Sequence, residues 1–317
     1  MTERPLRPVL HSVRRAGPTA AALLALCGCG VLGTRSQPAT ERPTAPVERS
    51  QQSTPATATD SPSALPQRPT AHHLRVSQFV FYSDFTLNPS DPLFRELEDL
   101  PDQLRRELRL PLGSNLVQVF LFEDQDKYEA YLRAWHPKLP TRPAYFIADK
   151  RAGSSAPELL VYTYLGRRLR TDLRHELTHA LLHGVLKGVP LWLDEGLAGF
   201  FEQPTANDGL NPSHLDALRV GPFQPNLSRL EKLSEVADMQ RGEYQEAWAW
   251  VHYFLRGTPE SRGVLLAYLQ TLRSTGSPGQ LTGKLEAVVR DPNRSLTDHL
   301  AATESAVKLK AARANGR

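Results

Sequence analysis

The sequence His-Glu-x-x-His at residues 175–179 carries the side chains best suited to chemistry in this chain. On a helix, positions four residues apart lie one turn apart on the same face. His175 and His179 can therefore each offer an imidazole nitrogen to one metal ion. Glu176 projects beside them, where it can handle a proton of a water molecule that the metal activates. Catalytic zinc usually takes three protein ligands, so the pattern predicts one zinc ion and a third ligand elsewhere.

The third ligand is predicted to be Glu195. It follows His179 by sixteen residues, which lets the chain leave one helix, turn and return on a second. His183 competes for this role, but histidines at i, i+4 and i+8 span about 12 Å along a helix, too far for one ion. His183 is instead interpreted as a polar residue favoured by the dipole at a helix C-terminus. Glu202 is either an orienting partner of a ligand histidine or a solvated surface residue.

Two helices are needed to position these side chains. Apolar residues around the motif recur at helical spacing, which predicts a first helix. Thr171-Asp172 is expected to supply its N-cap and a negative first turn, and Gly184 or Gly188 is expected to end it. Pro190 suits the first turn of the second helix.

Two stretches carry a family resemblance: His-Glu-Leu-Thr-His-Ala, and Pro-Leu-Trp-Leu-Asp-Glu-Gly-Leu-Ala further along the chain. They resemble the gluzincin metallopeptidases, and more closely the peptidase MA-like group of bacterial envelope proteins, which includes domains of unknown function. The resemblance is strong over about thirty residues and loose over the rest of residues 75–275. It implies that His175, His179 and Glu195 are zinc ligands and that Glu176 is the general base.

The chain departs from the thermolysin-like pattern at one position. Those enzymes carry an Asp four residues after the ligand Glu, where this chain has Gly199, so any partner of a ligand histidine must come from elsewhere. Related gluzincins also use a downstream Tyr to donate a hydrogen bond to the developing oxyanion. Tyr244 is the candidate here, ahead of Tyr253 and His252, and a structural role is the alternative for each of the three.

The composition of the chain excludes several other functional classes of protein. The 317 residues allow one large or two small domains, and they contain neither a glycine-rich phosphate loop nor a Gly-x-Ser-x-Gly elbow. The net charge of +4 is spread along the chain, so no nucleic-acid partner is expected. The two cysteines, Cys27 and Cys29, precede the folded part, which leaves histidine and carboxylate as the metal ligands.

The N-terminal residues predict export. Residues 1–29 combine a basic start with a short apolar run that ends in Leu-Cys-Gly-Cys, which resembles a bacterial lipobox with Cys29 as the lipidated residue. An ordinary cleaved signal peptide is the alternative. Residues 30–71 are rich in Pro, Ser and Thr and are predicted to be a disordered linker. The protein is thus expected to be lipid-anchored to a bacterial membrane, facing the periplasm or the exterior.

Residues 72–312 are predicted to form one α+β domain of zincin-like type, in which a small mixed sheet is followed by a mostly helical metal-binding part. Residues 313–317 are predicted to be a frayed tail. The expected strands lie at 75–85, 116–122, 143–148 and 158–164, and the expected helices include 92–110, with a break near Pro101, together with 124–135, 245–255, 260–273 and 296–312.

The function expected from these residues is zinc-dependent hydrolysis of peptide bonds at the cell envelope. An edge strand beside the site, either 143–148 or 159–164, is expected to pair with an extended peptide or protein substrate. The alternative is a catalytically silent zinc-containing binding or scaffold lipoprotein, and hydrolysis of a non-peptide amide is a third possibility. The natural substrate and the oligomeric state are left open.

Overall fold

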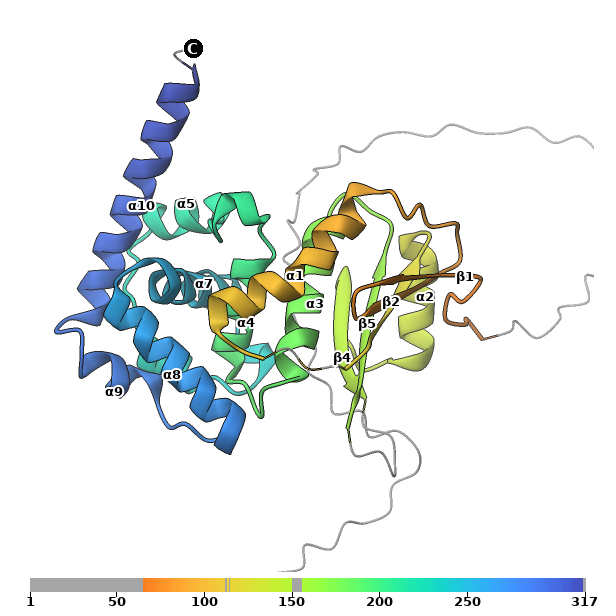
Figure 1. The fold of residues 1–317 in the computed structure, drawn as a ribbon, viewed down its shortest axis with the longest axis horizontal. Coiled ribbons are helices and arrows are strands. Elements are labelled where there is room, and N and C mark those ends of the chain that lie inside the picture. The colour runs from red at the N-terminus through yellow and green to blue at the C-terminus, as the bar shows by residue number, and fades with distance from the viewer. Residues whose placement is uncertain (1–64, 112, 114, 150–155, 316–317) are drawn as a thin grey trace, which may run out of the picture.

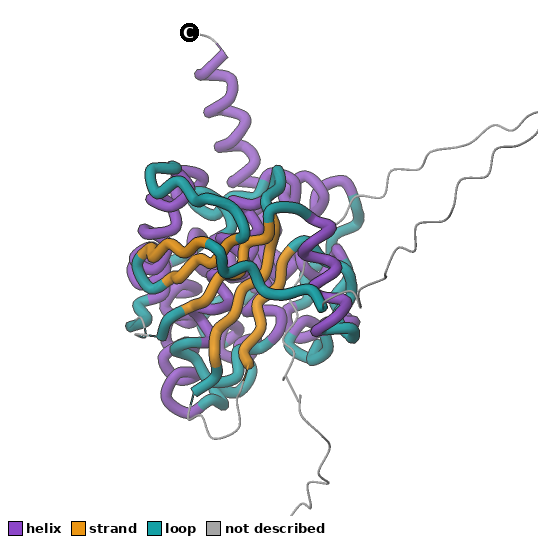
Figure 2. The backbone as a smooth tube through the Cα atoms, turned by 90° about the vertical axis from the view of Figure 1, so that its right-hand side faces the viewer, coloured by secondary structure: helices purple, strands orange, loops and turns teal. Residues whose placement is uncertain are grey.

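The strands in the described residues form one mixed sheet with the order β1-β2-β3-β5-β4. The computed structural model describes residues 65–111, 113, 115–149 and 156–315. The central pairs β2–β3 and β3–β5 are parallel, whereas β1 and β4 run antiparallel to their neighbours at the two edges. Figure 2 shows the strands of the sheet side by side in orange. The strands are β1 His72–Val76, β2 Phe79–Ser83, β3 Val117–Phe122, β4 Ala144–Asp149 and β5 Glu158–Tyr164.

Both faces of this sheet are buried, because apolar side chains point alternately to its two sides. On β5, Leu159 and Val161 join the main core, which also contains residues of α1 (Pro92–Leu108) and α3 (Leu169–His183). Leu160 and Tyr162 join a smaller core that includes residues of α2 (Gln125–Trp135). Helices therefore lie on both sides of the sheet, with α3 on one side and α2 on the other (Figure 1).

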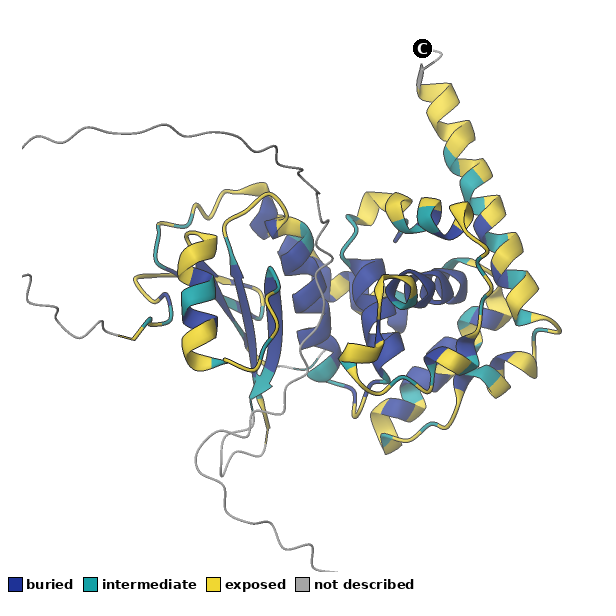
Figure 3. Cartoon of the chain, turned by 180° about the vertical axis from the view of Figure 1, so that it is seen from behind, coloured by how far each residue is buried: buried dark blue, intermediate teal, exposed yellow. Residues whose placement is uncertain are grey.

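The helical half of the molecule is built around α4 (Leu191–Phe201) and α7 (Arg241–Arg256). Every residue of α4 is buried, as expected for a helix that neighbours surround on all sides, and Figure 3 shows α7 dark blue at the centre. The two helices approach closely at Gly196, where an added Cβ would lie 2.5 Å from the carbonyl oxygen of Ala247. The other helices are α5 Pro212–Val220, α6 Leu227–Leu230, α8 Pro259–Thr275, α9 Leu281–Glu286 and α10 Pro292–Asn315.

The α+β class with a mixed sheet is confirmed, but several predicted boundaries are wrong. The strand expected at 75–85 is a hairpin of β1 and β2, because Ser77 turns the chain with a φ of 53° and Val76 pairs with Phe79. Helix α1 continues through Pro101 because its buried apolar stripe holds both halves against the core. Helix α3 begins earlier than expected, with Arg168 at its N-cap, so Thr171 and Asp172 lie inside its first turns.

The two ends of the described chain also differ from expectation. Residues 65–71, predicted to belong to the linker, pack on the sheet: Arg68 donates from Nε to the hydroxyl of Tyr131 at 2.9 Å, and its guanidinium lies 4.7 Å from the ring centre of Phe120. Pro69 is buried in the same segment. Helix α10 runs to Asn315, so residues 313–315 are helical instead of frayed. The predicted signal peptide and most of the linker lie outside the described residues.

Candidate metal centre

Helix α3 places His175 and His179 side by side. One turn separates them, and their ring centres lie 4.8 Å apart with the ring planes at 74°. Helix α3 contacts α1 and the sheet, and it also contacts α4. Its C-cap is Gly184, one of the two glycines expected to end it. Because the two histidines are four residues apart on α3, their imidazole rings lie next to each other in the interior of the protein.

Helix α4 brings Glu195 to the same point. Its Oε2 lies 3.5 Å from Nε2 of His175 and 3.9 Å from Nε2 of His179. All three residues offer a ligand atom within 4.8 Å of the others. Ligand atoms about 2.1 Å from a tetrahedral zinc ion would lie about 3.4 Å apart, so this separation fits a shared metal ion.

The hydrogen bonding of these atoms fits a metal as well. Apart from their contacts with one another, the Nε2 atoms of His175 and His179 and both carboxylate oxygens of Glu195 are buried without a hydrogen-bond partner among the described residues. Buried polar atoms are normally paired, because leaving one unpaired costs about 1–3 kcal/mol. Four such atoms at one point form a group that can hold a metal ion.

A carboxylate contacts the Nδ1 atom of each of the two candidate ligand histidines. Oε2 of Glu202 lies 2.9 Å from Nδ1 of His175, and Oδ1 of Asp194 lies 3.0 Å from Nδ1 of His179. A proton on Nδ1 that faces the carboxylate leaves the lone pair of Nε2 directed at the metal position. Glu202 is thus the orienting partner that the sequence offered as one of two alternatives. Asp194 was not predicted, although its place directly before Glu195 was a usable signal.

Charge supports this assignment of roles. Burial works against ionisation of Asp194, but the neighbouring His179 and His183 outweigh it and lower the pKa of this carboxyl. Burial likewise opposes ionisation of Glu202, and the hydrogen bond from His175 outweighs it, so its pKa is also lowered. Both carboxylates are therefore ionised at neutral pH: Glu202 forms a hydrogen bond with His175, and Asp194 forms an ion-pair contact with His179.

Glu176 lies beside the three ligands without joining them. Its side chain is 2% exposed, and Oε2 has no hydrogen-bond partner among the described residues. The backbone N–H of Phe146 donates a hydrogen bond to its carboxylate, so strand β4 helps to hold it. Burial raises the pKa of Glu176 to about 8, and the charges of Glu195 and Asp172 contribute to this rise. A carboxyl group with such a pKa can accept and return a proton near neutral pH.

His183 is absent from the cluster, as its spacing predicted. The dipole interpretation of this residue was incomplete, however. Its Nε2 lies 2.8 Å from Oδ2 of Asp194, and its ring contacts Phe146, with ring centres 5.3 Å apart. The residue is a partner of a buried carboxylate.

The three oxyanion candidates differ in position. Tyr244 lies in the first turn of α7 and is buried against the main core. Because α7 packs along α4, this places Tyr244 in the half of the molecule that carries Glu195, and its catalytic role stays a prediction. Tyr253 and His252 face α10: Nδ1 of His252 lies 2.9 Å from Nε2 of His299, and the ring of Tyr253 also contacts His299. This contact favours a structural role for both.

The strand order decides which of two segments can pair with another chain. Strand β5 lies between β3 and β4 and has both sides paired, so the predicted segment 159–164 is an interior strand. Strand β4 is the edge strand and contacts α3. Among the described residues, the segment predicted at 143–148 is therefore the one that has no neighbouring strand on one side, and on it the N–H of Phe146 donates to Glu176.

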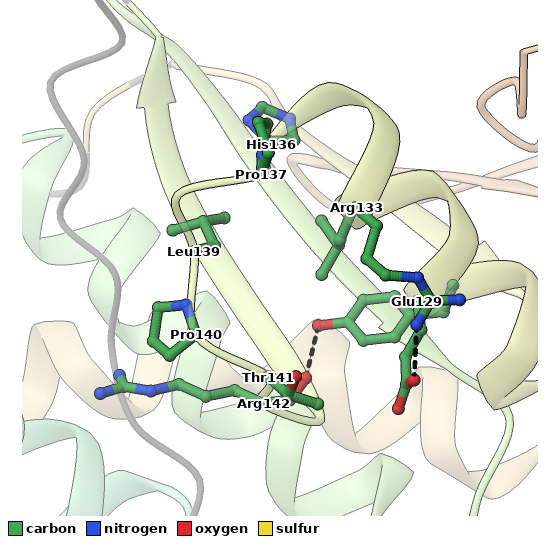
Figure 4. A pocket seen from close by; sticks show the side chains of 10 residues that line it. Glu129, Arg133, His136, Pro137, Leu139, Pro140, Thr141 and Arg142 are labelled. Carbon is green, nitrogen blue, oxygen red and sulfur yellow. Dashed lines mark hydrogen bonds and ion pairs between the residues drawn. The ribbon is translucent and has the colours of Figure 1, made fainter.

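A small pocket in the described structure lies between α2 and the loop before β4 (Figure 4). Its wall includes the ion pair of Glu129 with Arg133 and the hydroxyl of Tyr128, which donates to the carbonyl of Arg142. Its α2 residues belong to the opposite face of the sheet from α3. The pocket contains none of the predicted ligands.

No model of a known protein family matches the chain, and no curated protein matches it either. Within the residues that the structure describes, no helix has the length and apolar character required to cross a membrane.

Proposed function

We propose that this protein is a zinc-dependent peptidase of the gluzincin type, with one zinc ion on His175, His179 and Glu195. The observation that carries the proposal is the convergence of buried, unpaired ligand atoms from these residues beside Glu176. The donor set of two imidazoles and one carboxylate is one that catalytic zinc uses. When bound there, zinc would polarise the scissile carbonyl and lower the pKa of a water molecule.

The roles of the side chains follow from their surroundings. Glu202 and Asp194 hold the two imidazoles with Nε2 facing the metal position. Glu176, whose carboxylate is buried and has one unpaired oxygen, takes the proton of the attacking water and delivers it to the leaving amine. Tyr244 is proposed to donate a hydrogen bond to the developing oxyanion.

Substrate is proposed to bind as an extended peptide along β4. This strand lies at the edge of the sheet, contacts α3 and donates the backbone hydrogen bond to Glu176. Backbone pairing at an edge gives affinity with little side-chain preference, which suits a peptidase that acts on varied sequences. By the Leu-Cys-Gly-Cys sequence at its N-terminus, the enzyme is proposed to be a lipoprotein of the bacterial envelope, anchored through Cys29.

The test is cleavage of a diverse peptide library, followed by mass spectrometry. The purified full-length protein with zinc is compared with its Glu176→Gln variant, which keeps the ligands and removes the general base. We expect cleavage by the wild type and a loss of at least about 100-fold in the variant, the usual contribution of a general base. Equal cleavage by both proteins would mean that the activity does not come from this site.

One observation favours a second candidate function, a zinc-containing scaffold without turnover. The ligand group is almost closed, with His179 0%, Glu195 2% and His175 8% exposed. A structural zinc site is closed, whereas a catalytic site keeps a position open for water and substrate. Stoichiometric zinc in a protein that cleaves no library peptide would favour the scaffold.

A further inference from the structure

The carboxylate of Asp194 joins two imidazoles of α3. Its Oδ1 lies 3.0 Å from Nδ1 of His179, and its Oδ2 lies 2.8 Å from Nε2 of His183. Asp194 is fully buried, so its charge is stabilised by these groups and not by water. The two histidines are one helical turn apart, and each occupies one oxygen of the same carboxylate.

The second of these contacts does not involve the metal group. His183 is not a member of the candidate ligand cluster, since among the described residues only His175, His179 and Glu195 bring their ligand atoms together. Without the N–H of His183, one oxygen of a buried carboxylate would lose its partner, at a cost of about 1–3 kcal/mol. Rotation of Asp194 toward another donor would relieve this cost but would move Oδ1 away from His179.

We propose that His183 is a positioning residue for the metal centre, which acts through Asp194 to fix the ring of His179. The inference rests on the proposed function, because it requires that His179 binds the metal. His183 touches neither metal nor substrate in this arrangement. Its contribution is to hold Asp194 in the one orientation in which that carboxylate orients His179.

Two further contacts support the proposal. Phe146 on β4 packs against both rings, with its centre 6.4 Å from that of His179 and 5.3 Å from that of His183, so the two imidazoles share one wall. The other ligand histidine has a similar arrangement: the amide of Asn211 donates to Oε1 of Glu202 at 3.0 Å, while Oε2 faces His175. Each orienting carboxylate thus has a donor behind it.

The experiment measures the zinc affinity of the metal-free full-length protein by competition with a chromophoric chelator, with Zn²⁺ alone as the probe. His183→Leu is expected to weaken zinc binding about 10- to 100-fold, the usual effect of losing a partner behind a metal ligand. His183→Gln keeps an N–H near the position of Nε2 and should bind zinc within about threefold of the wild type.

A double-mutant cycle tests the route through Asp194. In an Asp194→Ala background, His183→Leu should change zinc affinity by less than about twofold, because the carboxylate on which it acts is gone. The matched control is His299→Leu, which removes another histidine that pairs with a buried ring, at 2.9 Å from His252 on α7. It should lower the melting temperature and leave zinc affinity unchanged.

Two results would overturn the inference: unchanged zinc affinity in His183→Leu, or an equal loss with and without Asp194. A wild-type protein that binds no zinc would overturn this inference and the proposed peptidase together. Wild-type zinc binding without peptide cleavage would count only against the peptidase. The weakened binding in His183→Leu would then still support the positioning role.

Discussion

Oε2 of Glu202 lies 2.9 Å from Nδ1 of His175, although 27 residues separate the two in the chain. Glu202 immediately follows the last turn of α4, the helix that also carries Glu195. One helix therefore carries a candidate metal ligand in its first half and, at its end, the carboxylate that contacts a candidate ligand on another helix. The geometry of the metal centre consequently depends on how α4 sits against α3.

Replacing Glu195 or Glu202 should weaken zinc binding to different degrees. Glu195→Ala removes a ligand and should abolish stoichiometric zinc, because two histidines alone hold the ion weakly. Glu202→Ala removes only the orienting contact and should weaken zinc about 10- to 100-fold. Glu202→Gln, which keeps an acceptor for the Nδ1–H, serves as the control. Metal content after gel filtration and chelator competition give both values, and full zinc content in Glu195→Ala would mean that the third ligand is another residue.

Close packing of α4 on α7 predicts opposite outcomes at two glycines of the same helix. A Cβ at Gly196 would lie 2.5 Å from the carbonyl oxygen of Ala247, whereas at Gly199 its nearest neighbour would be Cβ of Trp248 at 3.7 Å. Gly196→Ala should lower the free energy of unfolding by about 3 kcal/mol through overpacking. Gly199→Ala should leave it unchanged or raise it by up to about 1 kcal/mol, because alanine favours a helix. Urea unfolding of both variants compares them directly.

The histidine pair between α7 and α10 should make the protein sensitive to acid. Burial, with His299 and Arg256 nearby, lowers the pKa of His252 to about 3, and burial lowers that of His299 to about 4. Both are neutral in the folded protein, whereas the unfolded chain binds protons near pH 6.5. Their stabilising effect is thus complete above about pH 6.5 and is lost as the pH falls toward 4. From pH 7 to pH 5 the loss is on the order of 2 kcal/mol for each histidine.

Melting temperatures between pH 7 and pH 4.5 measure this effect. A His299→Gln variant should be less stable than the wild type at pH 7 and should lose less stability on acidification, since one titrating group is gone. The exposed His73→Gln change, on β1, is the control. Parallel pH profiles for the wild type and His299→Gln would show that the pair does not set the acid response.

The segment before β1 should contribute to stability. The guanidinium of Arg68 lies over the rings of Phe120 and Tyr162 and donates to Tyr131, and the indole of Trp135 donates to the carbonyl of Pro66 at 2.6 Å. Arg68→Ala should lower the free energy of unfolding by about 1–2 kcal/mol through lost cation–π and hydrogen-bond contacts. Arg75→Ala, which loses only a bond to a nearby backbone carbonyl, should change it by less than about 0.5 kcal/mol. Equal values for the two variants would refute this role.

Replacement of Cys29 by Ser should release the protein from membranes, because no acyl chains could then be attached. Fractionation of cells that express either form, followed by immunoblotting, measures the distribution. Cys27→Ser is the matched control and should leave the protein with the membranes. An unchanged membrane fraction for Cys29→Ser would exclude the lipid anchor.

The residues that meet at the metal centre could be predicted where local geometry fixes them. His175 and His179 adjoin because an α-helix has 3.6 residues per turn, and Glu195 follows at a spacing that lets a second helix return. Asp194 adjoins Glu195 in the chain, which was a usable signal, but its neighbour alone does not show that its side chain reaches His179. That contact depends on how α4 is rotated about its axis, and α4 also packs closely on α7 at Gly196.

The order of the strands in the sheet could not be predicted from local sequence patterns either. Residues of both β4 and β5 are apolar on both faces, so the sequence alone did not tell which strand lies at the edge. The sequence did not predict the turn between β1 and β2. Ser77 adopts a positive φ there, and such a position is usually marked by glycine or asparagine. The sequence predicted the type of most elements, but it missed boundaries such as the turn at Ser77 and the order of the strands.

Residues 65–71 and the candidate metal centre lie on opposite faces of the sheet. The rings under Arg68 belong to the sheet face that α2 covers, whereas the metal centre lies on α3 at the opposite face. The chain therefore leaves toward its N-terminus from the side that faces away from the metal centre. A segment that joins this domain to a membrane would thus start on the sheet face opposite the candidate metal centre.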